Sequence, residues 1–220
     1  MTTVAMTAQE KFIQPQISVT GEGKVKVIPD QAMISIAVET KGKESSKVKS
    51  DNDRIVDKVI KYLKTTKINQ NDIKTQRVSL YPSYDYNKKE DYFVANQTIN
   101  IFLKDLTQYE TLMSELIKAG VNRINSVNFQ SSQLERIKSE ARTLAVKDAR
   151  QKAQDFARAL GQKVGKAIIV SDNSQPIYYP VAYKSVMMEA DSIAGNGAQE
   201  TLAIGEMEVS VNVSITFTLE

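Results

Sequence analysis

The sequence predicts an α+β domain in which helices cover a largely antiparallel sheet, with about seven strands and three helices, one of them long. Three observations predict this class. Segments in which every second residue is apolar recur along the chain, as half-buried strands require. Amphipathic stretches with helical spacing separate these segments. The segments follow the order ββα, ββα, βα, ββ, which is typical of a largely antiparallel sheet with helices on one face.

The first two strand-type segments are expected to pair as a hairpin. Apolar residues alternate over residues 17–27 and again over residues 32–38, and a Pro-Asp turn lies between them. Gly21 and Gly23 interrupt the first segment, but no helix start with Lys-Ser/Thr follows, as a phosphate-binding loop would need. A strand bulge or a close backbone contact is the favoured interpretation.

The next elements are expected to be a helix and a second hairpin. Apolar residues fall on one helical face over residues 45–64, after a pair of serine caps. Residues 73–81 and 93–103 are strand-type segments that we expect to pair. The polar, tyrosine-rich residues 82–92 between them are expected to form a long loop at the tip.

Two further helices are expected after this hairpin. A capping box at Thr107 begins a short helix that Gly120 ends, and a strand over residues 124–129 follows. The longest helix is expected over residues 133–160, closed by Gly161, with a length of about 40 Å. This exceeds the width of a small sheet, so part of the helix is expected to project or to meet a neighbouring subunit. The predicted apolar stripe of this helix is Leu134, Ile137, Ala141, Leu144, Ala145, Ala149, Phe156 and Leu160.

The C-terminal part is expected to hold two strands around a long loop. Residues 164–170 predict a buried strand. Residues 172–205 have little regularity, and loops of such length are usually functional or disordered. Residues 207–219 alternate strictly, so one face of this last strand is expected to be buried and the other wet.

The amino-acid composition excludes several classes of catalytic and metal-binding site. The chain of 220 residues has no histidine, cysteine or tryptophan, and its 29 basic and 26 acidic residues give a net charge of +3. The absences exclude Ser-His-Asp triads, thiol nucleophiles, thiolate zinc sites and iron–sulfur clusters. The balanced charge lacks a nucleic-acid signature, and no apolar run approaches the ~18 residues of a membrane helix. We therefore expect no catalytic residues, no cofactor, no metal, no nucleic acid and no membrane span.

The N-terminal residues 1–16 are expected to lie outside a domain that spans residues 17–220. Residues 1–8 are small and apolar and precede polar residues, as at the cleavage region of a secretory signal peptide. A disordered N-terminus explains the same residues. The segment alone favours neither interpretation.

Several stretches resemble the SIMPL-domain family of bacterial envelope proteins. They begin at Val19 (VTGEGKVKVIPDQAMISIAVET), Asn71 (NDIKTQRVSLYPSYDY), Ala119 (AGVNRINSVNFQ), Ala141 (ARTLAVKDARQKAQDFARALGQKVGKAIIV) and Gly205 (GEMEVSVNVSITFTLE). The resemblance covers the chain from residue 17 onward. It implies a bacterial protein that is exported behind a signal peptide to the periplasm or is associated with the outer membrane. It also implies ring-like homo-oligomers in some members, and it carries no catalytic residues.

Tyrosines and a basic helix stripe are the candidate interface. Tyrosine offers a large contact area and is enriched at interfaces, although these rings could equally shield their own hairpins. The basic residues fall on one stripe of the long helix, for which a solvated face is the ordinary alternative. The candidate interface residues are Tyr84, Tyr86, Tyr92, Arg136, Lys147, Arg150, Arg158, Tyr178, Tyr179 and Tyr183.

Two groups of charged residues are more consistent with structural roles than with catalysis or metal binding. Asp148 and Lys152 lie four residues apart in the long helix and are expected to form an ion pair. Asp85, Glu90 and Asp91 lack the spacing and the glycine of an EF-hand loop, which disfavours a cation site.

Three hypotheses for function remain open. The first is a non-enzymatic exported envelope protein that self-assembles into a homo-oligomer. The second is an adaptor or stress-protective factor that binds other envelope proteins through residues 172–205. The third is a hydrolase that uses carboxylates or tyrosine.

Overall fold

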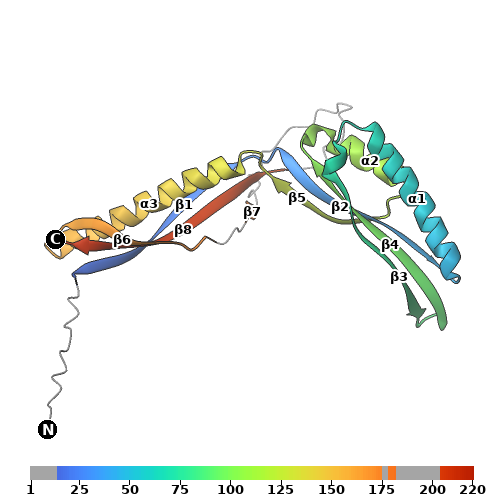
Figure 1. Cartoon of the computed structure of the whole chain (residues 1–220), viewed down its shortest axis with the longest axis horizontal. Helices are drawn as coiled ribbons and strands as arrows, with labels where there is room; N and C mark the ends of the chain where they lie inside the picture. The colour runs from blue at the N-terminus through green and yellow to red at the C-terminus, as the bar shows by residue number, and fades with distance from the viewer. Residues whose placement is uncertain (1–13, 175–177, 182–203) are drawn as a thin grey trace, which may run out of the picture. The chain divides into compact units, whose positions relative to one another are not determined.

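The computed structural model describes residues 14–174, 178–181 and 204–220, which form two compact units (Figure 1). The α3 unit consists of β1 (Gln16–Val27), α3 (Leu134–Ala159), β6 (Val164–Asp172), β7 (Tyr178–Val181) and β8 (Glu206–Leu219). The α1–α2 unit consists of β2 (Gln31–Gly42), α1 (Ser45–Thr65), β3 (Ile73–Asp85), β4 (Glu90–Leu103), α2 (Tyr109–Ala119) and β5 (Arg123–Gln130), with 3-10 helices at Gln70–Asp72 and Leu106–Gln108. The strands pair antiparallel, so the predicted α+β class is confirmed, with two sheets in place of one.

In the α3 unit, the long helix rests directly on a strand. β8 lies at the centre of the sheet between β1 and β6, and β7 also pairs with β8. The buried residues of α3 are Ile137, Ala141, Ala145, Ala149, Ala153 and Ala157. A Cβ atom at Gly21 would overlap the carbonyl oxygen of Ala145, and one at Gly23 would overlap that of Ala141. The predicted close backbone contact is therefore confirmed, and β1 pairs with β8 without a bulge.

The predicted apolar stripe of α3 is wrong at three of its large residues, although Ile137 is buried as predicted. Leu144, Phe156 and Leu160 are exposed, whereas Ala153 and Ala157 are buried. The contact between helix and strand backbones leaves room only for small side chains, so alanines occupy the buried positions. The larger residues lie outside this contact.

The predicted hairpin of the first two strands is also wrong. β1 pairs with β8 along its whole length, from Gln16 opposite Thr218 to Val27 opposite Met207. β2 pairs instead with β4 and β5, in the other sheet. An alternating pattern specifies which face of a strand is buried but not which strand lies beside it, so neighbours in sequence can enter different sheets.

Both sheets have one face packed on helix and one polar face. The α1–α2 unit has the strand order β3-β4-β2-β5, and α1 and α2 share one core with the sheet. The fully buried large residues of this core are Ile34, Ile36, Leu63, Ile99, Ile101, Leu103 and Leu116. In β8 the predicted alternation holds from Met207 to Phe217, but Thr216 and Thr218 on the predicted wet face are buried as well. They lie on a central strand, where Thr216 hydrogen-bonds Ser18 across 2.8 Å.

The second hairpin forms as predicted, but with longer strands. β3 continues to Asp85 and β4 begins at Glu90, so the predicted loop over residues 82–92 is wrong and only a short turn remains. The Asp85 carboxylate accepts from the main-chain N–H of Asn87 across 2.9 Å, and Lys89 adopts the left-handed conformation that closes the turn. Alternating aromatic residues with high strand propensity extend both strands.

One C-terminal prediction is wrong, and another falls mostly on residues outside the described part of the chain. β6 was expected to be buried, but it lies at the edge of its sheet and exposes Ile168, Ile169 and Val170. The segment predicted as the loop 172–205 contains β7, and its residues 175–177 and 182–203 lie outside the described residues.

Candidate functional site

The outer edge of β3 exposes apolar side chains. β3 is the outermost strand of its sheet, and α1 packs mainly across β2 and β4. Val78 pairs with Gln97 and Leu80 with Ala95, both of which are buried, so Val78 and Leu80 lie on the helix-covered side of the sheet. Val78 is nevertheless 54% exposed. Val78 and Leu80 share this side, whereas Tyr81, the next residue along the strand, lies on the opposite side. The three exposed side chains together are called the β3 edge surface.

Three of the predicted tyrosines lie at the turn end of the same hairpin. The rings of Tyr84 and Tyr86 meet edge to face, with centroids 5.1 Å apart. The Lys41 ammonium lies 5.9 Å from the ring centroid of Tyr92. Tyr86 is 84% exposed. The ring contacts fit the shielding interpretation, and the exposure of Tyr86 leaves a surface for a partner.

Three more tyrosines were predicted at the interface. Tyr178 and Tyr179 lie in strand β7, and Tyr183 lies outside the described residues. They therefore stay predictions.

The basic stripe of α3 lies on the side of the helix away from its buried alanines. Arg136 pairs with Glu140 at 3.5 Å, and Arg158 pairs with Asp155 at 3.7 Å. The other two residues of the stripe, Lys147 and Arg150, are exposed. Acidic neighbours thus neutralise two of the four cations, which leaves a mixed stripe and not a uniformly basic one.

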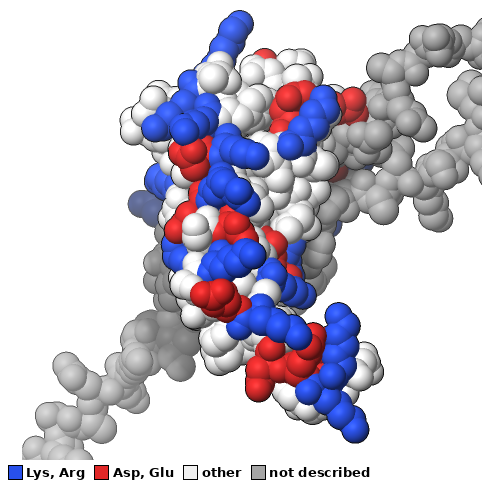
Figure 2. Space-filling model, turned by 90° about the vertical axis from the view of Figure 1, so that its right-hand side faces the viewer, with Lys and Arg blue, Asp and Glu red and all other residues white. Residues whose placement is uncertain are grey.

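The face of the molecule seen in Figure 2 carries interleaved basic and acidic side chains without a large patch of one sign. Short ion pairs of this mixed kind also occur within α1, such as Lys49 with Asp53 at 2.5 Å and Lys61 with Asp57 at 2.6 Å. Exposed pairs of this kind contribute little to stability. This face therefore offers no electrostatic footprint for a polyanion.

Asp148 and Lys152 form the predicted ion pair, at 2.7 Å. Asp148 also accepts from the main-chain N–H of Glu22 across 2.8 Å, and Lys152 donates to the Thr20 carbonyl oxygen across 3.2 Å. The hydrogen bond from Lys152 and that from Glu22 lower the pKa of the Asp148 carboxyl group. The pair thus fastens α3 to the edge of β1 and has a structural role.

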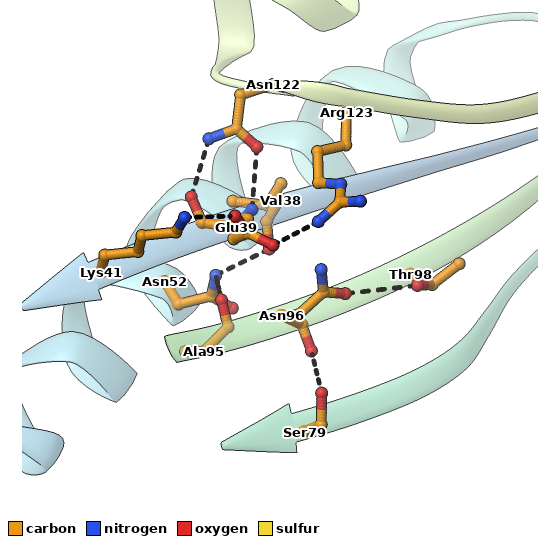
Figure 3. Close-up of polar contacts among 10 residues, drawn as sticks. All are labelled: Val38, Glu39, Lys41, Asn52, Ser79, Ala95, Asn96, Thr98, Asn122 and Arg123. Carbon is orange, nitrogen blue, oxygen red and sulfur yellow. Dashed lines mark hydrogen bonds and ion pairs between the residues drawn. The ribbon is translucent and has the colours of Figure 1, made fainter. Parts of the chain in front are cut away.

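A polar network crosses the open face of the β3-β4-β2-β5 sheet (Figure 3). The Glu39 carboxylate pairs with Arg123 at 2.5 Å and with Lys41 at 3.3 Å. The Asn122 side chain accepts from the Glu39 main-chain N–H across 2.9 Å and donates to the Glu39 carbonyl oxygen across 2.7 Å, as a neighbouring strand would. Burial raises the pKa of Glu39, but the hydrogen bonds from Arg123 and Lys41 outweigh burial and the net pKa is lowered.

A polar hollow of about 590 Å³ lies on the same open face. Residues from all four strands line it, namely Met33, Ser35, Gln76, Arg77, Thr98, Asn100, Asn125, Ser126 and Asn128. Within the part of the chain that the structure describes, the lining contains no carboxylate, and Met33 is its only apolar residue. Asn100 Oδ1 is buried and has no hydrogen-bond partner among the described residues.

Sequence reasoning missed this hollow. The only signal was the polar half of the alternation in β4, where Asn96, Thr98 and Asn100 separate buried apolar residues. That pattern alone predicts a solvent-facing strand surface. The contributions of β2, β3 and β5 follow from strand order, which the sequence did not reveal.

No group of three or more acidic side chains lies close enough to hold a metal ion within residues 14–174 and 204–220. No helix among the described residues is both long and apolar enough to cross a membrane.

Comparisons with known proteins agree with the resemblance seen in the sequence. The family model SIMPL, described as a protein of unknown function (DUF541), matches residues 17–217. The uncharacterized protein YggE of Escherichia coli (strain K12) is 30% identical over 99% of this chain and 88% of its own length. The 26 kDa periplasmic immunogenic protein of Brucella melitensis is 26% identical over 97% of this chain and 89% of its own length.

A more distant relative comes from an animal. The interleukin-1 receptor-associated kinase 1-binding protein 1 homolog of Xenopus laevis is 22% identical over 71% of this chain and 63% of its own length. The family match extends over nearly the whole chain and takes in both sheets and all three helices. The chain therefore belongs to the SIMPL family.

Proposed function

We propose that this chain is a non-enzymatic, exported protein of the cell envelope that self-assembles and binds proteins through the β3 edge surface. The exported location rests on the Brucella relative, which is named periplasmic. Protein binding finds support in the Xenopus relative, which is named a binding protein. The observation that carries the proposal is the apolar outer edge of β3.

An exposed edge strand presents unpaired N–H and C=O groups to any second strand. Natural proteins block such edges with prolines and bulges. In β3 a bulge lies at Gln76 and a proline at position 82. These two features flank residues 77–81, whose outer edge is left open. This open segment carries Val78, Leu80 and Tyr81, and it fits addition of a strand from a partner.

A second copy of this chain is the occupant that the segment fits. Antiparallel pairing of two copies about Ser79 would place Val78 opposite the partner's Leu80. The same pairing places Arg77 opposite the partner's Tyr81, and an arginine over a tyrosine ring is attractive. The edge is thus self-complementary in both its apolar and its charged residues, as a two-fold interface must be.

The test is the oligomeric state of matched variants. Val78 on β3 and Ile124 on β5 lie on opposite edges of one sheet and are 54% and 52% exposed. We expect concentration-dependent self-association of the wild-type protein in sedimentation-velocity runs. Val78→Lys should weaken it by about tenfold or more, which is about 1.4 kcal/mol per interface, whereas Ile124→Lys should leave it unchanged.

Two outcomes would overturn the proposal. A wild-type protein that remains a monomer at every concentration removes self-assembly. Equal weakening by Val78→Lys and Ile124→Lys removes the β3 edge as its site. Circular dichroism of both variants controls for folding.

A further inference from the structure

We propose that the polar hollow on the open face of the β3-β4-β2-β5 sheet binds a saccharide that carries a carboxylate. The hollow is separate from the β3 edge surface in its chemistry, because its lining is almost wholly polar. The inference does not rest on the self-assembly proposed above, although Arg77 belongs to both surfaces.

Two β-bulges build the hollow. The register of β3 against β4 shifts between Thr75 and Arg77, which makes Gln76 an extra residue. The register of β5 against β2 shifts at Ser35, which makes Asn125 an extra residue. Bulges redirect side chains and are frequent beside functional sites.

The two bulges lie at the same level of the sheet. Each is adjacent to the cross-strand row in which Ile36 pairs with Ile99. As a result the edge strands each supply two consecutive polar residues to the lining, Gln76 with Arg77 and Asn125 with Ser126. A regular strand would direct only one residue of each pair toward this face.

One residue of the lining, Asn100, carries an unmet hydrogen-bonding group. Asn100 Oδ1 is buried without a partner, and buried polar oxygens in folded proteins are nearly always paired. The neighbouring amides are only weakly engaged, since Asn125 donates to Ser35 across 3.4 Å and Asn128 donates to Ser126 across 3.3 Å. A ligand that accepts from these two amides would give both of them a stronger partner.

The charge of the lining selects the ligand class. Among the described residues, Arg77 is the one cation that lines the hollow, and no carboxylate lines it. A guanidinium group binds a carboxylate through two parallel hydrogen bonds. Sugar hydroxyls both donate and accept, which matches a lining of side-chain amides and hydroxyls.

Other ligand classes fit less well. A peptide relies on apolar anchors, and Met33 is the only apolar residue of the lining. A nucleic acid requires several cations and stacking rings, and the lining offers one arginine and no ring. An acidic saccharide uses the amides, the hydroxyls and Arg77 together.

The experiment measures binding of defined probes to the full chain. The acidic probe is a hyaluronan tetrasaccharide, which alternates a glucuronate with an uncharged sugar. Chitotetraose serves as the uncharged probe, sodium acetate as the carboxylate alone, and tetraglutamate as an acidic peptide. Calorimetry gives affinities, and side-chain amide signals of the asparagines in nitrogen-15 NMR spectra locate the site.

Three variants sharpen the test. Arg77→Gln removes the cation at an exposed position, and Asn100→Ala removes the central amide. Lys41→Gln is the matched control, because Lys41 lies on the open face of the same sheet but outside the hollow. Circular dichroism and thermal unfolding check that each variant folds.

We expect the hyaluronan probe to bind saturably and to shift the amide signals of Asn100, Asn125 and Asn128. Arg77→Gln and Asn100→Ala should each lower its affinity about tenfold or more, whereas Lys41→Gln should change it less than about twofold. Chitotetraose and acetate should bind at least about tenfold more weakly than the hyaluronan probe. Absence of saccharide binding, equal binding by wild type and Arg77→Gln, or preference for acetate or tetraglutamate would each overturn the proposal.

Discussion

The side-chain amide of Asn52 donates to the main-chain carbonyl oxygen of Val38 across 2.9 Å, inside the core of the α1–α2 unit (Figure 3). The same nitrogen lies 3.2 Å from Thr40 Oγ1 and 3.4 Å from the Ala95 carbonyl oxygen, so it joins α1 to both β2 and β4. Asn52 is 1% exposed, and a buried amide is tolerated only when it is hydrogen-bonded. One side chain therefore fixes the position of α1 on the sheet.

Replacing this amide should destabilise the fold. Asn52→Leu has a similar volume but no donor, so the buried carbonyl oxygens lose a partner, at a cost of about 1–3 kcal/mol. Urea unfolding gives the free energy of unfolding. Lys58→Leu is the control, because Lys58 is exposed on the same helix and its change should stay within about 0.5 kcal/mol. Equal stability of the two variants would contradict the role of Asn52.

A methyl group at Gly21 should also destabilise the protein. Its carbon would overlap the Ala145 carbonyl oxygen and lie 2.6 Å from the Ala149 nitrogen, and backbone atoms of a helix cannot move aside cheaply. We expect Gly21→Ala to lower the free energy of unfolding by about 1–3 kcal/mol. Thr20→Ala, at the exposed neighbouring position, should have a smaller effect. An unchanged free energy of unfolding in Gly21→Ala would show that α3 packs less closely on β1.

The sequence predicted which residues face the core better than it predicted which strands meet. Alternation correctly marked Val19 and Val211 as buried, but their pairing joins opposite ends of the chain, and no local pattern encodes that. In the long helix, hydrophobic periodicity favoured Phe156 over Ala153 because large apolar residues dominate the pattern. The contact of α3 with Gly21 and Gly23 of β1 accepts only small side chains, so Ala153 is buried and Phe156 is exposed. The candidate hollow needed strand order and two bulges, neither of which leaves a recognisable mark in one sequence.

The lowered pKa of Glu39 predicts a pH dependence of stability. Because the folded pKa lies below the usual 4.5, the ionised carboxylate stabilises the folded state above that pH, and this contribution is lost as the pH falls through the lowered value. The melting temperature of Glu39→Gln should therefore lie below that of wild type at pH 7, and the two should converge in acid. Glu44→Gln, at an exposed position, is the control and should lower the melting temperature at pH 7 less than Glu39→Gln does. A constant gap between Glu39→Gln and wild type would contradict this origin of the pKa.

The Asp148 carboxylate offers a test in which two contacts can be separated. The hydrogen bond from Lys152 is the larger cause of its lowered pKa, and the main-chain N–H of Glu22 is the next. In carbon-13 NMR titrations, Lys152→Met should raise the pKa of Asp148 only part of the way to its usual value, because the bond from Glu22 on β1 persists. Lys147→Met should leave that pKa unchanged, since Lys147 lies on the opposite side of α3. Full restoration of the usual pKa in Lys152→Met would mean that α3 is not fastened to β1 through this carboxylate, and an unchanged pKa would mean that the ion pair does not form in solution.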